Sequence, residues 1–369
     1  MKCIPIFFCL FVFCSADPQI LYLTQFTIAN GQSTFAYEKG SNLYLSSSDS
    51  TDVLKNIILT IDGQIIPLDT LRDVTRDDGS QLPLKLGDSL TISTTNSNDI
   101  TSKLTGFIYV STAKQANDEN FSVYVIQNNI KIMKTSGQST SVILNTAYGV
   151  TQHSNTPFRT SLVKKIEQDH SAKLRIYSDI PYDNYTYDDT PWKSLFYNPI
   201  VFESLNENGI MEDTEMFFNN IEHIQMSYVS WYILSSGNIN VIIEKLWMNN
   251  IETTTTSLNT TGLIVNAADA SSINITVDFL NNPNPQTLGM FVKCQPTDNI
   301  DFIFSNNGQD VLHAHFNTTF PETGILEWKV GKDATKFQIL SSQMLPGAYS
   351  VQYFVIDGVI GSLTTQPTL

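Results

Sequence analysis

Beyond residue 16 this chain has almost no cysteine. Three of its four cysteines, Cys3, Cys9 and Cys14, fall within the first sixteen residues, and only Cys294 follows. A single cysteine forms no internal disulfide, so the fold must be held by its hydrophobic core. Cys294 is therefore either a small buried hydrophobic residue or the donor of an intermolecular bridge.

Positive charge and long apolar runs are also scarce. The chain has 21 Lys and Arg against 36 Asp and Glu, a formal net charge of −15. An acidic chain without basic clusters argues against nucleic acid and anionic membrane as partners. Past the N-terminus no stretch is long and apolar enough to predict a transmembrane segment, and residues 362–369 are too polar for a lipid-anchor signal.

The N-terminus has the layout of a cleaved secretory signal. Lys2 precedes an apolar run from Ile4 to Phe13, and small residues stand near Ala16. We predict a signal peptide over 1–16, and the alternative is a membrane anchor. Cleavage would leave 369 − 16 = 353 residues with a secreted, extracellular destination.

Five Asn-x-Ser/Thr sequons follow the signal. In an exported chain they predict surface positions and N-glycosylation. The acceptors are Asn120, Asn184, Asn259, Asn274 and Asn317.

Composition and alternation predict an all-β protein with very little helix. Charged residues make up 15% of the chain, and apolar and polar residues alternate between turn signals. We expect tandem antiparallel β-sandwich modules of jelly-roll type. Predicted pairs of strands flank Asp62-Gly63, Gly87-Asp88, Asn128-Asn129 and Ser236-Gly237-Asn238, and a further strand follows Pro346-Gly347. Two short helices are predicted, over 161–168 and 211–221.

Polar stretches predict the module boundaries. Residues 113–120 are polar between strands, and residues 252–261 are rich in Thr. We divide the chain into modules over 17–118, 119–251 and 252–369, the second of which carries an aromatic and acidic loop. Two domains remain the alternative, because the strand after residue 120 could complete the first sandwich.

Gly87-Asp88-Ser89-Leu90 spells the signature of GDSL esterases. Asp310 and His313 supply the Asp-x-x-His of that family, so an esterase would use Ser89 as nucleophile, His313 as base and Asp310 to orient it. The nucleophile of that fold stands between a parallel strand and a helix. Here Ser89 is followed by a predicted strand and no alternating helices, which argues against the esterase.

VLHAHFNTTF (311–320) allows three interpretations. It can be a core or edge strand with a glycan at Asn317, which we favour, a sugar-binding strand, or a metal pair of His313 and His315 on one strand face. A metal site needs further ligands, and the sequence names none. His315-Phe316-Asn317 resembles the sugar strand of galectins, but Thr319 stands where that family has Arg, and Trp328 comes too soon to be its stacking Trp.

The most probable place for ligand binding is a loop within IPYDNYTYDDTPWKSLFYNP (180–199). Aromatic side chains stack on sugar rings, acidic groups bind hydroxyls or calcium, and loops on rigid β-scaffolds usually carry function. The alternative is a loop whose aromatics pack back on the sandwich. The predicted binding residues are Tyr185, Tyr187, Asp188, Asp189 and Trp192.

The first module resembles the secreted CUB-like proteins of nematodes. The resemblance rests on residues 26–63 and 80–99, where strand, small polar stretch, apolar strand, Asp-Gly and a Ser/Thr-rich strand recur. It departs in lacking cysteines after Ala16. The resemblance implies a secreted, non-enzymatic protein linked to intestinal innate defence and membrane rafts.

Together these patterns favour a secreted, non-enzymatic glycoprotein that binds extracellular protein or glycan and needs no cofactor or metal. The alternatives are the esterase and a structural protein of the extracellular matrix.

Overall fold

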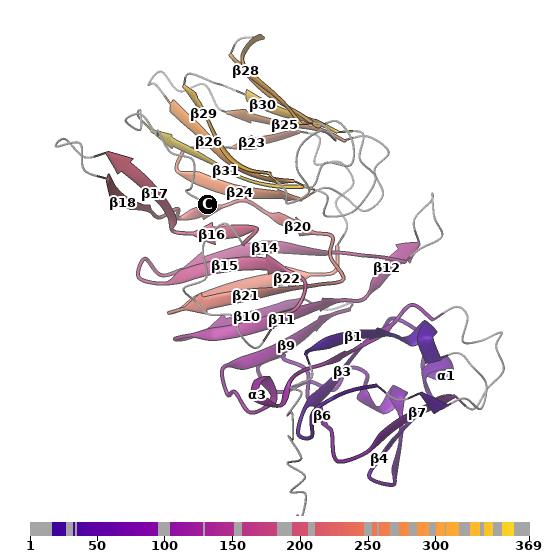
Figure 1. Cartoon of the computed structure of the whole chain (residues 1–369). Helices are drawn as coiled ribbons and strands as arrows, with labels where there is room; N and C mark the ends of the chain where they lie inside the picture. The colour runs from indigo at the N-terminus through magenta and orange to yellow at the C-terminus, as the bar shows by residue number, and fades with distance from the viewer. Residues whose placement is uncertain are drawn as a thin grey trace, which may run out of the picture.

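The computed structural model of the chain consists almost entirely of β-strands (Figure 1). The described helices are single turns of four residues: η1 (Leu23–Phe26), α1 (Thr51–Leu54), η2 (Leu68–Leu71) and α3 (Ala113–Ala116). The predicted all-β fold with very little helix is confirmed. The structure describes residues 17–26, 32–33, 35–94, 104–127, 130–150, 157–182, 194–205, 211–246, 253–256, 258–265, 273–279, 286–294, 300–306, 308–316, 325–332, 336–341 and 349–357.

The N-terminal strands form a sandwich of two antiparallel four-stranded sheets. Sheet 1 contains, in spatial order, β1 (Gln19–Tyr22), β8 (Phe107–Val110), β3 (Asn42–Ser46) and β6 (Leu84–Lys85). Sheet 2 contains β2 (Gln32–Ser33), β7 (Leu90–Thr94), β4 (Ile57–Ile61) and β5 (Gln64–Pro67). Alternate residues of β4 are buried, as the period of two along a strand requires, and they meet Leu43, Leu45 and Ile108 of sheet 1.

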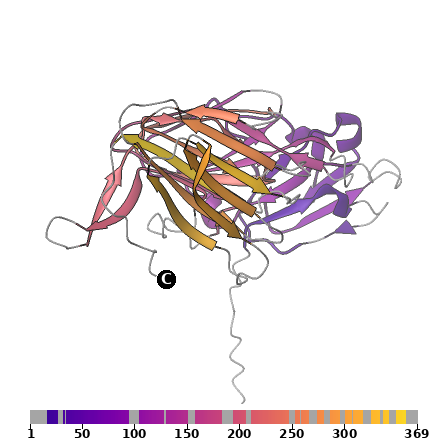
Figure 2. The ribbon, with the colours of Figure 1, turned by 90° about the horizontal axis from the view of Figure 1, so that it is seen from above.

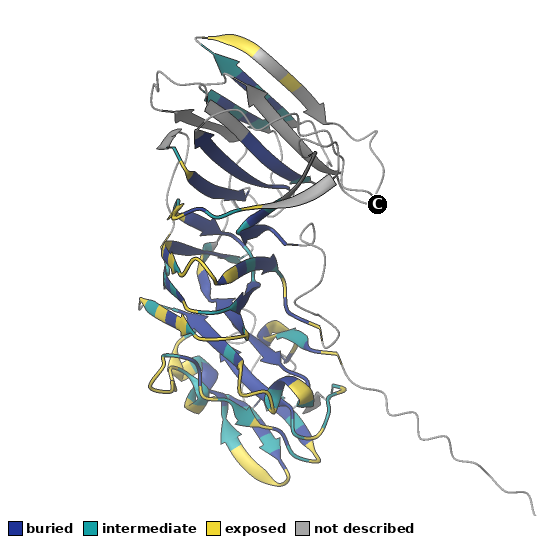
Figure 3. Ribbon diagram, turned by 90° about the vertical axis from the view of Figure 1, so that its left-hand side faces the viewer, coloured by how far each residue is buried: buried dark blue, intermediate teal, exposed yellow. Residues whose placement is uncertain are grey.

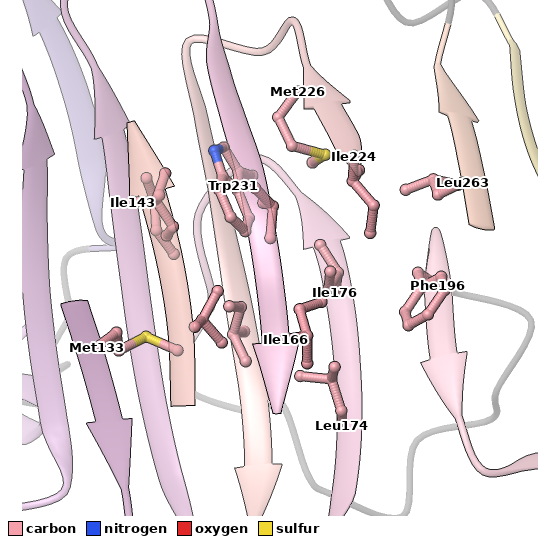
Figure 4. Close-up of a cluster of buried hydrophobic side chains, with 14 of the residues drawn as sticks. Met133, Ile143, Ile166, Leu174, Ile176, Phe196, Ile224, Met226, Trp231 and Leu263 are labelled. Carbon is pink, nitrogen blue, oxygen red and sulfur yellow. The ribbon is translucent and has the colours of Figure 1, made fainter. Parts of the chain in front are cut away.

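The middle strands form a second sandwich, and its core surrounds Trp231 (Figure 4). Sheet 3 contains β16 (Phe196–Asn198), β15 (Lys173–Ser178), β21 (Ser230–Ser236), β11 (Ser139–Asn145) and β9 (Phe121–Ile126). Sheet 4 contains β10 (Lys131–Thr135), β22 (Ile239–Glu244), β14 (Ser161–Gln168) and β20 (Ile224–Met226). Trp231 is fully buried, and its indole Nε1–H donates to Ser161 Oγ at 3.3 Å, which satisfies the one polar atom of the ring.

Two short ribbons extend from the middle strands. One pairs β12 (Ala147–Val150) with β13 (Pro157–Arg159), and the other pairs β17 (Ile200–Leu205) with β18 (Met211–Met216). The β17–β18 ribbon projects sideways from the body in both views (Figures 1 and 2).

The C-terminal strands form a third sandwich of two five-stranded sheets. Sheet 5 contains β19 (Asn220–Ile221), β24 (Thr260–Val265), β31 (Tyr349–Asp357), β26 (Gln286–Cys294) and β29 (Ile325–Lys332). Sheet 6 contains β23 (Thr253–Thr256), β25 (Ile273–Phe279), β30 (Lys336–Ser341), β27 (Ile300–Asn306) and β28 (Gln309–Phe316). Aromatic rings join the two layers: Phe337 and Tyr353 have centroids 5.6 Å apart.

Sheet 3 is buried on both faces. Along β21, Trp231 and Ile233 enter the core shared with sheet 4, whereas Tyr232 and Leu234 pack against Tyr109 and its neighbours on sheet 1. This arrangement explains why nearly every residue is buried along β21 and β11 of sheet 3, and along β8 of sheet 1 (Figure 3). Sheets 2, 1, 3 and 4 are therefore four successive layers, and the predicted division at residues 118 and 251 stays a prediction.

Arg159 joins the second sandwich to the first. It is 8% exposed, and its guanidinium Cζ lies 5.5 Å from the ring centroid of Tyr22 and 5.4 Å from that of Phe107. Nη2 also donates to the carbonyl of Thr105, and burial lowers the pKa of the guanidinium. A buried cation that lies over two neighbouring aromatic rings is stabilised by their π-faces, so this residue fixes the junction.

The C-terminal sandwich closes one end of the middle one. Leu263 and Val265 of β24 belong to the core around Trp231, and Phe218 packs against Phe354 of β31 with centroids 5.9 Å apart. The second junction is therefore an extension of the middle core.

Both predicted helices are wrong. Residues 161–168 form β14, where the register shifts between Val163 and Lys165. This bulge puts Val163 and Ile166 on the same buried face, opposite Ile243 and Val241 of β22, so these two core residues acquire the three-residue spacing of a helix while remaining in a strand. Residues 211–216 form β18, and 220–221 form β19.

One of the predicted hairpins is confirmed. Asp62 and Gly63 have φ of 47° and 83° and connect β4 to its neighbour β5, as a type I′ turn requires. The strands around Gly87-Asp88, Asn128-Asn129 and Gly237 are present, but they are not paired: the second strand of each pair belongs to the other sheet of its sandwich. Asn128 and Asn129 themselves lie outside the described residues. The sequence signals a tight turn but not which sheet the next strand joins. The strand predicted after Pro346-Gly347 is present as β31. The turn itself lies outside the described residues.

Candidate functional site

The loop predicted to bind a ligand connects β15 to β16. These strands pair antiparallel with Ile176 opposite Phe196, so the loop closes a β-hairpin and its two ends leave sheet 3 side by side. The structure describes residues 179–182 and 194–195 of the connection. Tyr185, Tyr187, Asp188, Asp189 and Trp192 lie outside the described residues.

Gln115 anchors the first end of this loop. It belongs to a capping box at α3, and its Oε1 accepts from the backbone N–H of Thr112 and from the hydroxyl of Tyr109, both at 3.1 Å. Its Nε2 donates to the carbonyl of Pro181 at 2.7 Å. Because Gln115 is 4% exposed, these bonds are shielded from water and hold the loop on the first sandwich. Nothing in the sequence pattern links residues 115 and 181, so this anchor was not predicted.

The remaining anchors are backbone hydrogen bonds and apolar packing. Asp179 has a φ of 72°, its N–H donates to the carbonyl of Ser230 at 3.0 Å, and burial raises the pKa of its carboxyl group. Ile180 is buried beside the stacked rings of Tyr177 and Tyr232, whose centroids lie 4.8 Å apart. At the second end the N–H of Leu195 donates to the carbonyl of Ile176 at 2.7 Å.

Tyr182 is the first aromatic residue beyond the anchors. Its side chain is 50% exposed, whereas Ile180 is 6% exposed. The base of the loop is therefore rigid up to Pro181, and the chain comes to the surface at an aromatic ring.

A shallow hollow lies at the opposite end of the same hairpin. The volume open to the centre of a water molecule is about 30 Å³, and Lys173 and Glu215 at its rim form an ion pair of 3.4 Å. Both side chains are about half exposed, so this pair contributes little to stability. Its other lining residues are Leu174, Arg175, Tyr197, Asn198, Pro199 and Val201.

The GDSL segment closes the tip of the β4–β5 hairpin. The backbone N–H of Ser89 donates to Asp62 Oδ1 at 2.8 Å, and the N–H of Asp62 lies 3.2 Å from Ser89 Oγ. A Cβ on Gly87 would lie 1.7 Å from Asp62 Oδ2, so any larger residue would displace this carboxylate. Gly87 and Ser89 thus have a structural role at a turn.

The structure does not bring the three esterase residues together. Ser89 precedes β7 in sheet 2, whereas Asp310 and His313 are on β28 in sheet 6, at the other end of the molecule (Figure 1). His313 is hydrogen-bonded to Asp301. This separation disfavours a Ser89–His313–Asp310 triad.

His313 and Asp301 form a pair on sheet 6. His313 Nε2 lies 2.9 Å from Asp301 Oδ1, and the side chains are 51% and 28% exposed. The strands β27 and β28 pair with Asp301 opposite His315 and Ile303 opposite His313. Asp301 was not predicted as a site residue, because only the register of two strands reveals which residue lies opposite the histidines.

Only part of the galectin-like segment lies within the described residues. His315 and Phe316 end β28, and Asn317 lies outside the described residues. Trp328 is on β29 in sheet 5, a different sheet from β28.

Two of the predicted glycosylation sites are exposed. Asn120 lies between α3 and β9, and Asn259 has a φ of 56° in the turn before β24. Asn274 is on β25, where only the backbone is described, and Asn184 and Asn317 lie outside the described residues. The signal segment 1–16 is likewise outside them, and Cys294 ends β26 opposite Ile325 and Tyr349.

Among the described side chains, which do not include that of His315, no group of three or more His, Cys, Asp or Glu is arranged to hold a metal ion. Among the described helices, none has the length and apolar character needed to cross a membrane.

Comparison with known proteins gives one family. A family model described as a transmembrane glycoprotein matches residues 38–369. No curated protein matches the chain. Among solved structures, the insecticidal delta-endotoxin Cry8Ea1 from Bacillus thuringiensis is 10% identical over 50% of this chain and 42% of that chain, with a TM-score of 0.18. A TM-score this low carries no argument, and the resemblance to CUB-like proteins stays a prediction.

Proposed function

The chain belongs to the transmembrane glycoprotein family, and on that premise we propose that it is an extracellular, non-enzymatic glycoprotein that binds a protein or glycan ligand through the β15–β16 loop. The observation that carries this proposal is the anchoring of that loop by Gln115 and Asp179 at its first end and by Leu195 at its second. A connection fixed at both ends presents its tip with a smaller loss of conformational entropy on binding.

The chemistry of the loop supports a sugar or a polar protein surface as the ligand. Tyr182 stands exposed at the base, and the sequence beyond it alternates aromatic and acidic residues up to Trp192. Aromatic faces stack on apolar faces of sugar rings, while carboxylates accept hydrogen bonds from hydroxyl and amide groups.

The sequons support the glycoprotein and extracellular parts of the proposal. Asn120 and Asn259 are both exposed, and each stands just before a strand. Secretion with removal of residues 1–16, intestinal defence and association with membrane rafts extend the proposal on the basis of sequence patterns and resemblance alone.

The placement of Ser89 supports a non-enzymatic role. Its backbone and hydroxyl are engaged with Asp62 at an exposed turn, and β28 with His313 is at the far end of the stack (Figure 1). No second function is favoured by a specific contact.

The experiment uses the full secreted chain on a glycan array and in pull-downs from extracellular material. We expect Trp192→Ala and Tyr182→Ala each to weaken binding about tenfold, equivalent to about 1.4 kcal/mol. Tyr148→Ala is the matched control, because Tyr148 is also exposed, at 44%, but lies on the β12–β13 ribbon.

Binding that is unchanged in both loop variants would refute the loop as the site. Absence of any discrete ligand together with self-association would favour the matrix protein. Ester hydrolysis lost in Ser89→Ala would favour the esterase.

A further inference from the structure

Sheet 6 brings a carboxylate close to the two histidines of β28, for which the sequence alone indicated no third metal ligand. Two imidazoles two residues apart on a strand are close enough to share a metal ion but need a third donor. Asp301, on the neighbouring strand β27, already contacts His313 through Nε2 and Oδ1 at 2.9 Å.

The register places the same carboxylate opposite the second histidine. Asp301 is the backbone partner of His315, and His313 is the partner of Ile303, two residues further along β27. Directly opposed residues of an antiparallel pair have Cβ atoms about 4.5–5.5 Å apart, and diagonal neighbours about 7–8 Å. Asp301 is therefore directly opposite His315 in the sheet. It is the diagonal neighbour of His313, to which its side chain is hydrogen-bonded.

We propose that His313, His315 and Asp301 form a binding site for one transition-metal ion of the Zn²⁺ class on sheet 6. Two nitrogen donors and one carboxylate are a donor set that zinc accepts, and three protein ligands leave a fourth position open. A water molecule or a carboxylate of a bound partner can occupy that position.

The distance between the described donors is compatible with this geometry. Two donors about 2.0–2.1 Å from a tetrahedral ion lie about 3.3 Å from each other. The observed separation of 2.9 Å must therefore increase by only a few tenths of an ångström. With His313 51% exposed, a small rotation of its ring achieves this change without disturbing the core.

Entry of the ion requires no opening of the fold. The buried side of β27 is formed by Phe302 and Phe304, which alternate with Asp301 along the strand. The metal would therefore lie on the outer face of the sheet, and loss of a ligand residue should leave the sandwich folded.

The test is titration of the full chain, prepared without a polyhistidine tag, with Zn²⁺ by isothermal calorimetry. Co²⁺ replaces Zn²⁺ in a parallel experiment, because its visible absorption reports four-coordinate binding. We expect one ion per chain, and a loss of affinity of at least about tenfold in each of His313→Ala, His315→Ala and Asp301→Asn.

Two matched variants control for histidine and carboxylate content elsewhere. His170 stacks on Phe217 at 4.2 Å, and Asp88 pairs with Lys39 at 2.9 Å at the other end of the molecule. His170→Ala and Asp88→Asn should each bind Zn²⁺ as the unaltered chain does, and circular dichroism should show the same strand content in all five variants.

Three outcomes would overturn the site. The first is absence of any stoichiometric binding, and the second is binding that no variant weakens, which would be adventitious metal. The third is a loss in His313→Ala and Asp301→Asn but not in His315→Ala, which would reduce the three-ligand site to a two-residue contact.

Discussion

The side-chain amide of Gln352 hydrogen-bonds to both backbone groups of Tyr197. The N–H of Tyr197 donates to Gln352 Oε1 at 3.1 Å, and Gln352 Nε2 donates to the carbonyl of Tyr197 at 2.8 Å. Tyr197 is on β16, the edge strand of sheet 3, and Gln352 is on β31 in the middle of sheet 5. One side chain therefore substitutes for the next strand at an edge that would otherwise present unpaired backbone groups.

Replacing Gln352 with Leu should destabilise this junction. Gln352 is 1% exposed, so the variant leaves a backbone donor and acceptor buried without their partner. At about 1–3 kcal/mol for each group, we expect a loss of about 2–6 kcal/mol, measured by urea unfolding. Gln64→Leu, an exposed position on β5, is the control. A loss no larger than that of the control would contradict the role of Gln352.

Arg159→Ala should weaken the junction between the first and second sandwiches. The variant removes a cation that lies over the rings of Tyr22 and Phe107, together with a charged hydrogen bond to the carbonyl of Thr105. We expect a loss of about 2–4 kcal/mol in thermal or urea unfolding. Arg159→Met should lose less, because it retains part of the apolar contact. Arg76→Ala, at an exposed position, is the reference. An equal loss of stability in that variant would argue against the role of Arg159 at the junction.

Gly87→Ala should destabilise the first sandwich through its contact with Asp62. The new methyl group overlaps the carboxylate and forces it away from the N–H of Ser89. We expect a cost of about 1–3 kcal/mol. In an Asp62→Gly background, which also accepts the φ of 47°, the same change should cost much less. Additive effects in this double-mutant cycle, followed by urea unfolding, would contradict the contact.

Stability should fall between pH 10 and pH 12. Burial raises the pKa of Tyr124 to about 12, above its ordinary value of 10.0, and burial raises the pKa of Tyr197, Tyr228 and Tyr353 as well. Because the pKa is higher in the folded state than in the unfolded state, each buried tyrosine contributes fully to the free energy of unfolding below pH 10. This contribution is lost as the pH rises toward 12. For Tyr124 alone it amounts to about 3 kcal/mol.

Circular dichroism and tyrosinate absorbance followed through this range would measure the loss. Tyr124→Phe should flatten the decline, whereas Tyr148→Phe at an exposed position should not. An equally steep decline of strand signal in Tyr124→Phe would count against this account.

The sequence predicted the class of fold and most strand positions, because alternation and turn residues are local signals. Asp62-Gly63 gave a hairpin correctly, since φ > 0 at both turn residues requires such a pair. Gly87-Asp88 gave a turn but not a hairpin, because the partner of β7 is decided by burial of Leu90 and Ile92 on sheet 2. The helix predicted over 161–168 failed because a bulge imitates helical spacing.

The sites depend on contacts between distant segments. Asp301 lies opposite His315 only after β27 and β28 are in register, and Gln115 meets Pro181 only after two sandwiches are stacked. Neither relation leaves a pattern in the chain. The loop residues that composition singled out remain a prediction.

A strand with two apolar faces carries a risk that an ordinary amphipathic strand avoids. If β21 shifted by one residue, Tyr232 and Leu234 would exchange sides with Trp231 and Ile233, and polarity alone would scarcely oppose the change. What opposes it is size and shape: the cavity that holds the indole of Trp231 also presents the hydroxyl of Ser161, and no other residue of β21 matches both. Misaligned forms of this protein are therefore excluded by steric fit, so we expect alterations of side-chain volume in this layer to produce alternative alignments before they produce unfolding.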